Sequence, residues 1–193
     1  MTSLFSQVRN RTEWQRFRLW LGFAVLACLT FSAELKADET EEREHGIIAG
    51  FLVNFFSYVE WPQEAGNGTG GPLLLGIAGD SAYNSVSESL KSKTVNGRRI
   101  EVRKVDDLNN LTEFQVVFIS ASEGRRQRQI LERTRNSAVL TVGQAAGFLD
   151  EGGVINLVPV HDKFKFDINR TAADKAHLKI SLPLLKLSRR IIN

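Results

Sequence analysis

The stretch Leu73-Leu74-Leu75-Gly76-Ile77-Ala78 has no polar side chain over the length of a typical strand, and Gly79-Asp80 ends it. A continuous apolar run of this length is typical of a strand that is buried on both faces. Residues 116–119 form a further run of the same character, and residues 139–142 are expected to form another strand. We therefore predict a central sheet that is covered on both sides.

Helical patterns separate these runs. Residues 82–92 have apolar side chains four positions apart, and a charged helix capped by Ser120 or Ser122 is expected to reach about Arg135. The segment 99–105 is more polar than the other strands, which places it near an edge of the sheet. Alternating strands and helices are the order of a mostly parallel sheet. The prediction is an α/β fold, a Rossmann-like three-layer sandwich.

The end of the chain follows a different pattern. Gly152-Gly153 opens residues 154–160, and residues 164–168 alternate in the manner of a strand, so a C-terminal β-hairpin is expected. Residues 182–191, with Pro183 in the first turn, predict a closing helix that docks on the core. Structural roles in the backbone or as polar groups are expected for Gly152, Gly153, Asn156 and Asn169.

An aromatic helix precedes the first strand. Apolar residues recur at helical spacing from Ile47 to Val59, and Pro62 forbids continuation. The aromatics at positions 51, 55, 56, 58 and 61 are more than one buried stripe requires, so some must face a groove or partner. Core and contact roles stay equally open for Trp61. The predicted partner-binding residues are Phe56, Tyr58, Trp61 and Pro62, and Asn54 is predicted to be a buried polar residue.

The N-terminal segment has the features of a secretory signal. Residues 19–31 form an apolar run that is too short to span a bilayer, arginines precede it, and Leu35-Lys36-Ala37 ends in a small residue. The predicted organisation is a signal peptide over residues 1–37, a polar linker over 38–45 and one α/β domain over 46–193. An uncleaved anchor, or a lipoprotein modified at Cys28, are the alternatives.

Charge and cysteine content exclude several classes of protein. The formal net charge of +3 resides in the first 37 residues, because residues 38–193 carry 20 basic and 20 acidic side chains. A balanced charge gives no general electrostatic footprint for nucleic acid. Cys28 is the single cysteine, so a chain cleaved after Ala37 has no disulfide, no thiol nucleophile and no thiolate metal site.

No motif of an enzyme is present. The chain lacks the spacings of a nucleophile elbow, a zinc protease, a phosphate-binding loop or a dinucleotide fingerprint. His45, His161 and His177 lie far apart, so we predict no catalytic residue, no metal and no cofactor. The alternative to a partner-binding protein is a small-ligand binder that uses the carboxyl ends of the strands. Its candidate residues are Gly79, Asp80 and Ser120.

The charged helix that follows Ser122 carries five arginines, at positions 125, 126, 128, 133 and 135. These could form a docking face for an acidic partner or for lipid headgroups. A solvated helix face, with Arg128 and Glu132 as an ordinary pair one turn apart, is the simpler interpretation.

Over about residues 46–190, the sequence resembles the YfiR-like family of bacterial periplasmic proteins. Blocks that match in order begin with the helix that ends in Val59-Glu60-Trp61-Pro62 and the strand that ends in Gly79-Asp80. The remaining blocks are Asn96-Gly97-Arg98, residues 116–120, Val139-Leu140-Thr141-Val142, Gly152-Gly153-Val154-Ile155-Asn156, Phe166-Asp167-Ile168-Asn169, Leu178-Lys179-Ile180-Ser181 and Leu184-Leu185-Lys186-Leu187.

The resemblance implies a regulator without catalytic activity. Its best-understood members bind the periplasmic sensor region of an inner-membrane diguanylate cyclase and hold the cyclase inactive, and they tend to self-associate. The implied partners are therefore a membrane-bound signalling protein and a second copy of the chain, as a homodimer. Members of the family type form disulfides, whereas the corresponding strands here carry Gly76 and Gln115. Redox control is therefore not implied for this chain.

Overall fold

The computed structural model describes residues 40–62, 70–161 and 163–193. The chain divides into two units, Met1–Glu44 and His45–Asn193, and the account below concerns the second. The predicted signal peptide, with Cys28 and the cleavage site, lies outside the described residues. Residues 40–58 form a helix, called the first helix here, so residues 40–45 are helical where a linker was expected.

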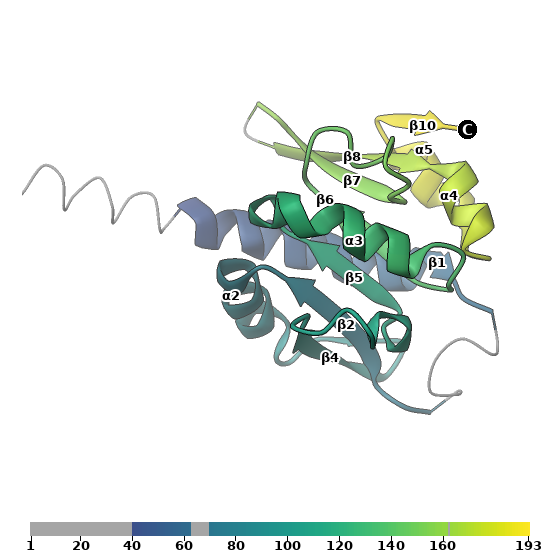
Figure 1. The fold of residues 1–193 in the computed structure, drawn as a ribbon. Helices are drawn as coiled ribbons and strands as arrows, with labels where there is room; N and C mark the ends of the chain where they lie inside the picture. The colour runs from purple at the N-terminus through teal and green to yellow at the C-terminus, as the bar shows by residue number, and fades with distance from the viewer. Residues whose placement is uncertain (1–39, 63–69, 162) are drawn as a thin grey trace, which may run out of the picture. The chain divides into compact units, whose positions relative to one another are not determined.

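The domain is built on an eight-stranded sheet of order β10-β8-β7-β6-β5-β2-β4-β3 (Figure 1). Strands β4, β2, β5, β6 and β7 run parallel to one another. Strand β3 is antiparallel to β4, β8 is antiparallel to β7, and the edge strand β10 runs parallel to β8. The bounds are β2 Leu73–Ala78, β3 Thr94–Val95, β4 Arg98–Lys104, β5 Val116–Ile119, β6 Leu140–Gly143, β7 Ile155–Val160, β8 Lys163–Asn169 and β10 Arg190–Ile192. A separate two-stranded ladder pairs β1 Val59–Glu60 with β9 Lys179–Ile180.

Helices cover both faces of the sheet, as predicted. The first helix and α2 (Asp80–Leu90) pack on one face, and α3 (Gly124–Thr134) packs on the other, which faces the viewer in Figure 1. Side chains of β2 alternate between the two cores: Leu75 joins the first helix, and Leu74 joins α3. Because right-handed crossovers that run in opposite directions along a sheet place their helices on opposite faces, this topology produces three layers.

The predicted hairpin is present, and the Phe148 ring, which lies between Gly143 and Gly153, packs before its first strand. Strands β7 and β8 pair antiparallel from Ile155 opposite Ile168 to Val160 opposite Lys163. Before them, Phe148 is fully buried, and a Cβ atom at either Gly143 or Gly153 would collide with its ring. Gly152 has a φ of +98°, in the region that favours glycine. The two glycines before the hairpin therefore have different roles: Gly152 allows a turn, and Gly153 allows the Phe148 ring to approach the backbone closely.

The predicted closing helix is wrong in its extent. Helix α5 covers only Leu182–Leu187, and Ile191 lies in β10. The chain is drawn into the sheet because the Arg189 N–H donates to the Phe166 carbonyl at 2.8 Å and the Arg189 side chain binds the Asp167 carboxylate, which is 2% exposed. Arg190 lies 3.4 Å from the same carboxylate. Ion pairing to a buried acid thus converts the end of the expected helix into an edge strand.

A short helix that the sequence patterns had not indicated, α4 (Arg170–Lys175), follows β8. The Asn169 side chain caps it by accepting a hydrogen bond from the Ala172 N–H at 2.9 Å, and its amide donates to the Leu149 carbonyl at 2.9 Å. Asn169 therefore joins α4 to the loop before the hairpin. The Asn156 side chain on β7 has its Oδ1 buried without a hydrogen-bond partner. Within the described ranges, no helix is both long enough and apolar enough to cross a membrane.

Candidate functional site

An apolar groove lies between the first helix and α5. Its volume is about 200 Å³, and we call it the aromatic groove. The residues that line it are Phe51, Asn54, Phe55, Tyr58, Phe166, Leu184 and Leu187. Its two walls are more than 100 positions apart in the sequence, so they meet only because α5 folds back over β8.

Three phenylalanine rings form the floor of the aromatic groove. Phe166 meets Phe51 and Phe55 edge to face, with ring centroids 5.9 and 5.5 Å apart, and Phe51 lies 6.0 Å from Phe55. Such contacts stabilise a cluster beyond the area that it buries, so the floor is rigid. The rim is open, because Tyr58 is 40% exposed and Leu187 is 70% exposed. An exposed rim on a rigid aromatic floor is suited to binding an apolar side chain.

The predicted contact residues separate into exposed and buried ones. Tyr58 is exposed, whereas Phe56 is 5% exposed and packs in the core, so Phe56 has no surface to offer a partner in this structure. Trp61 and Pro62 are half-buried. The Trp61 indole donates to the Gln115 carbonyl at 3.1 Å, and its ring lies 5.9 Å from that of Phe56. Trp61 therefore secures the end of the first helix to the strand region while part of its ring stays accessible.

The structure corrects the expected positions of two residues near this groove. Asn54 is exposed and lines the groove, although a buried role was expected. Leu187 was expected to dock on the core, yet it projects into solvent at the rim. Leu187 is exposed because α5 is less than two turns long and buries only Leu184 on the core. The aromatic surplus in residues 51–61 indicated a groove, but no sequence signal indicated its C-terminal wall.

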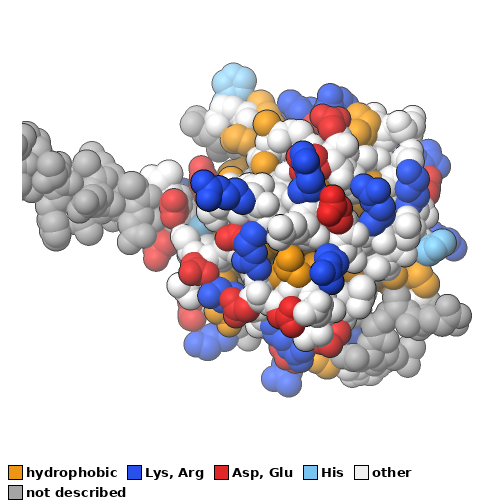
Figure 2. All heavy atoms as spheres, in the orientation of Figure 1, with side chains coloured by type: hydrophobic (Ala, Val, Ile, Leu, Met, Phe, Trp, Pro, Cys, Tyr) orange, Lys and Arg blue, Asp and Glu red, His pale blue; other side chains and the backbone are white. Residues whose placement is uncertain are grey.

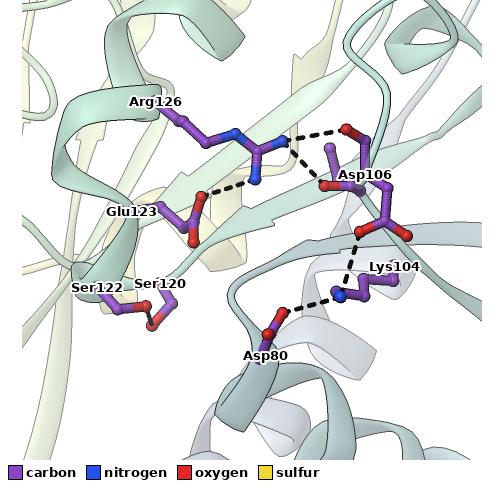
Figure 3. A network of polar contacts seen from close by, with 8 residues as sticks. Asp80, Lys104, Asp106, Ser120, Ser122, Glu123 and Arg126 are labelled. Atoms are coloured by element: carbon purple, nitrogen blue, oxygen red, sulfur yellow. Dashed lines mark hydrogen bonds and ion pairs between the residues drawn. The ribbon is translucent and has the colours of Figure 1, made fainter.

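A second cluster is polar and lies at the carboxyl ends of β2, β4 and β5 (Figure 3). The connection from β2 leads to β4 on one side, whereas β5 lies on the other side of β2. Open α/β sheets bind ligands at the carboxyl ends of strands at such a point. The Lys104 ammonium lies 3.0 Å from Asp80 and 3.2 Å from Asp106. Hydrogen bonding to Asp80, and then to Asp106, raises the pKa of Lys104. The cation is thus already held by two carboxylates.

The rest of this polar cluster is also paired internally. Arg126 donates to Glu123 at 3.0 Å and to the Val105 carbonyl at 3.1 Å, and the Ser122 and Ser120 hydroxyls lie 3.3 Å apart (Figure 3). A Cβ atom at Gly79 would lie 2.7 Å from that of Ser120, so the two strand ends are in close contact. The predicted ligand residues Gly79, Asp80 and Ser120 do come together, but the charges around them satisfy one another.

The arginines of α3 lie on a mixed surface. Figure 2 shows basic and acidic side chains interspersed on the face that α3 covers. Arg128 lies 3.4 Å from Glu151 rather than forming the expected pair within the helix, and Arg133 donates to Asn109 at 3.1 Å. A hydrogen bond from Gln127, and secondarily the Arg128 interaction, lowers the pKa of Glu151. These contacts favour the solvated interpretation of the helix face over a docking face.

A further cavity, of about 680 Å³, lies among the end of α3, the loop before β7, α4 and β10. It is polar, with Thr141 and Asn169 in its wall and both Arg135 and Glu151 at its edge. Thr141 and Asn169 already bond to backbone groups, since the Thr141 hydroxyl accepts from the Val154 N–H at 3.1 Å. Among the residues that the structure describes, no group of three histidine, cysteine, aspartate or glutamate side chains could hold a metal ion.

Comparison with known proteins identified one family. The sequence profile of the family described as YfiR/HmsC-like matches residues 45–189. A search of curated proteins found no match.

Two solved structures are similar in part. An ABC domain in complex with L-Trp from Streptococcus pneumoniae is 13% identical, with a TM-score of 0.49, over 62% of this chain and 55% of that one. A conserved domain protein from Vibrio cholerae is 14% identical, with a TM-score of 0.45, over 62% of this chain and 54% of that one. The chain thus spans about half the length of these structures.

Proposed function

Since the chain belongs to the YfiR/HmsC-like family, we propose that it is a periplasmic regulatory protein that binds the sensor region of an inner-membrane signalling protein and represses a diguanylate cyclase. The family comprises periplasmic regulators of diguanylate cyclase signalling rather than enzymes. We further propose that the protein acts as a homodimer.

The aromatic groove is the observation that supports this proposal. A binding surface gains most of its affinity from a few aromatic anchors that are rigid and become desolvated in the complex. Tyr58 is exposed at the rim of the groove, and the half-buried Trp61 and Pro62 follow it along the chain. We assign Tyr58 as the principal contact, with Trp61 and Pro62 beside it.

Deletion of the gene for this protein from its host is expected to raise the cellular concentration of cyclic di-GMP, because the diguanylate cyclase would no longer be repressed. Mass spectrometry of nucleotide extracts measures the concentration. The unaltered chain should restore the low level, and a chain with Tyr58→Ala should fail to do so at equal abundance. An unchanged nucleotide level in the deletion strain would exclude repression of a diguanylate cyclase.

The processed protein is expected to begin near Asp38 and to be recovered in the periplasmic fraction. The short apolar run and the Leu35-Lys36-Ala37 sequence are the reasons. Mass spectrometry of the protein isolated from its host reads the N-terminus directly. A first residue at Cys28 with added lipid mass would replace this prediction with the lipoprotein alternative, and an intact Met1 would contradict cleavage.

A further inference from the structure

The balanced charge of residues 38–193 includes a cationic C-terminal region. Residues 163–193 contain eight basic residues and two acidic ones, Asp167 and Asp174. Asp167 is buried, whereas all eight basic residues are exposed. The basic residues are Lys163, Lys165, Arg170, Lys175, Lys179, Lys186, Arg189 and Arg190. The side chains of this region therefore carry a net positive charge, although residues 38–193 as a whole are neutral.

Helix α5 presents aliphatic side chains to solvent within this cationic region. Leu182 is 62% exposed and Leu187 is 70% exposed, the two highest values among the large exposed hydrophobic side chains of the described residues. Leu184, between them, is 3% exposed and holds the helix on the core. The two leucines thus project from a fixed helix, at a distance along its axis of roughly 8 Å.

Lysines flank these leucines. Lys186 lies within α5, and Lys179 lies on β9, three positions before Leu182. Two carboxylates are close: Glu60 is opposite Lys179 in the β1–β9 ladder, and Asp174 lines a cavity of about 230 Å³ with Lys179. Asp167 also pairs with Arg189 and Arg190. Together these acids offset only part of the charge, because the region carries eight basic residues.

We propose that α5, with Leu182, Leu187 and the surrounding lysines, docks on the surface of an anionic lipid bilayer. Aliphatic side chains that project beside lysines match an interface in which apolar groups enter the acyl boundary and cations meet the headgroups. A protein partner is instead anchored mainly by aromatic and arginine side chains in fitted pockets, and leucine is under-represented among such anchors. The proposal does not depend on the regulatory role, and it would hold the protein beside membrane-embedded partners.

Vesicle flotation of the processed chain tests this proposal. The chain should float with phosphatidylglycerol vesicles and remain unbound with phosphatidylcholine vesicles, and binding should weaken as salt is raised. Leu182→Ser with Leu187→Ser should reduce the partition coefficient by at least about tenfold, because burial of two leucine side chains is lost. Lys179→Gln with Lys186→Gln should reduce it by about 30-fold, since each lysine contributes roughly fivefold near an anionic surface.

The matched control is Lys91→Gln with Lys93→Gln, which removes the same charge near the end of α2, beside β3 at the opposite edge of the sheet. This control should change the partition coefficient by less than about twofold. All variants carry the same processed N-terminus, so the residues that precede the first helix contribute equally. Equal binding to both lipids, no binding, or an equal loss in the control would each overturn the proposal. So would intact binding of the leucine variant together with a loss of self-association in sedimentation, since the leucines would then form a contact between copies.

Discussion

Replacing Phe148 with alanine should lower the free energy of unfolding by about 3–5 kcal/mol, the usual cost of deleting a fully buried phenylalanine ring. The ring has no exposed surface and lies between Gly143 and Gly153 in the loop that joins β6 to the hairpin. Its removal leaves a cavity that this backbone cannot readily close. Urea unfolding measures the change, and a loss below about 1 kcal/mol would show that the loop does not depend on the ring.

A second pair of variants makes the test specific to this contact. Gly153→Ala alone should also be destabilising, because the new Cβ atom would collide with the Phe148 ring. In the double variant, the alanine methyl group can occupy the space that the ring vacates. The double variant should therefore lose less free energy of unfolding than the sum of the two single variants. Strictly additive losses would contradict direct packing of the ring against Gly153.

Trp61→Ala should mainly lower the stability of the domain, whereas Tyr58→Ala should mainly weaken its binding to the sensor region. Trp61→Ala should cost about 3 kcal/mol of unfolding free energy, because the ring packs on Phe56 and its N–H bonds to Gln115. Tyr58→Ala should change that free energy by about 0.5 kcal/mol or less while weakening the complex with the sensor region about 30-fold. Urea unfolding reads the first quantity, and a titration with the purified sensor region reads the second.

Two controls accompany these variants. Trp61→Phe should cost only about 1 kcal/mol or less, because the Gln115 carbonyl still accepts the Leu140 N–H at 2.8 Å. Tyr83→Ala, at the only other tyrosine of the chain, removes the same side chain from α2 and should leave sensor affinity unchanged. Unchanged affinity with Tyr58→Ala would remove the aromatic groove as the contact surface. If Tyr58→Ala destabilised the domain as much as Trp61→Ala does, Tyr58 would have a structural role in the core rather than a contact role.

The strands of the domain could be predicted because burial on two faces leaves a direct trace in the sequence. Leu73–Ala78 and Val116–Ile119 were predicted with the bounds that the structure gives them, since each is a continuous apolar run. The three-layer architecture followed from the alternation of strands and helices, and the hairpin followed from the glycines and the alternating pattern after them. The surplus of aromatics before Pro62 indicated that part of the first helix faces a groove.

The C-terminal part of the chain was decided by tertiary contacts. Residues 182–191 have a helical pattern of leucine and isoleucine, yet the helix ends at Leu187 because the buried Asp167 carboxylate binds Arg189 and Arg190 and aligns β10 with β8. The aromatic groove likewise needs Phe166 and Leu187 to meet the first helix, which periodicity cannot foresee. Local patterns record which face of an element is buried. They do not record which distant segment covers it, because that depends on the ion pairs and ring contacts that form when the chain closes.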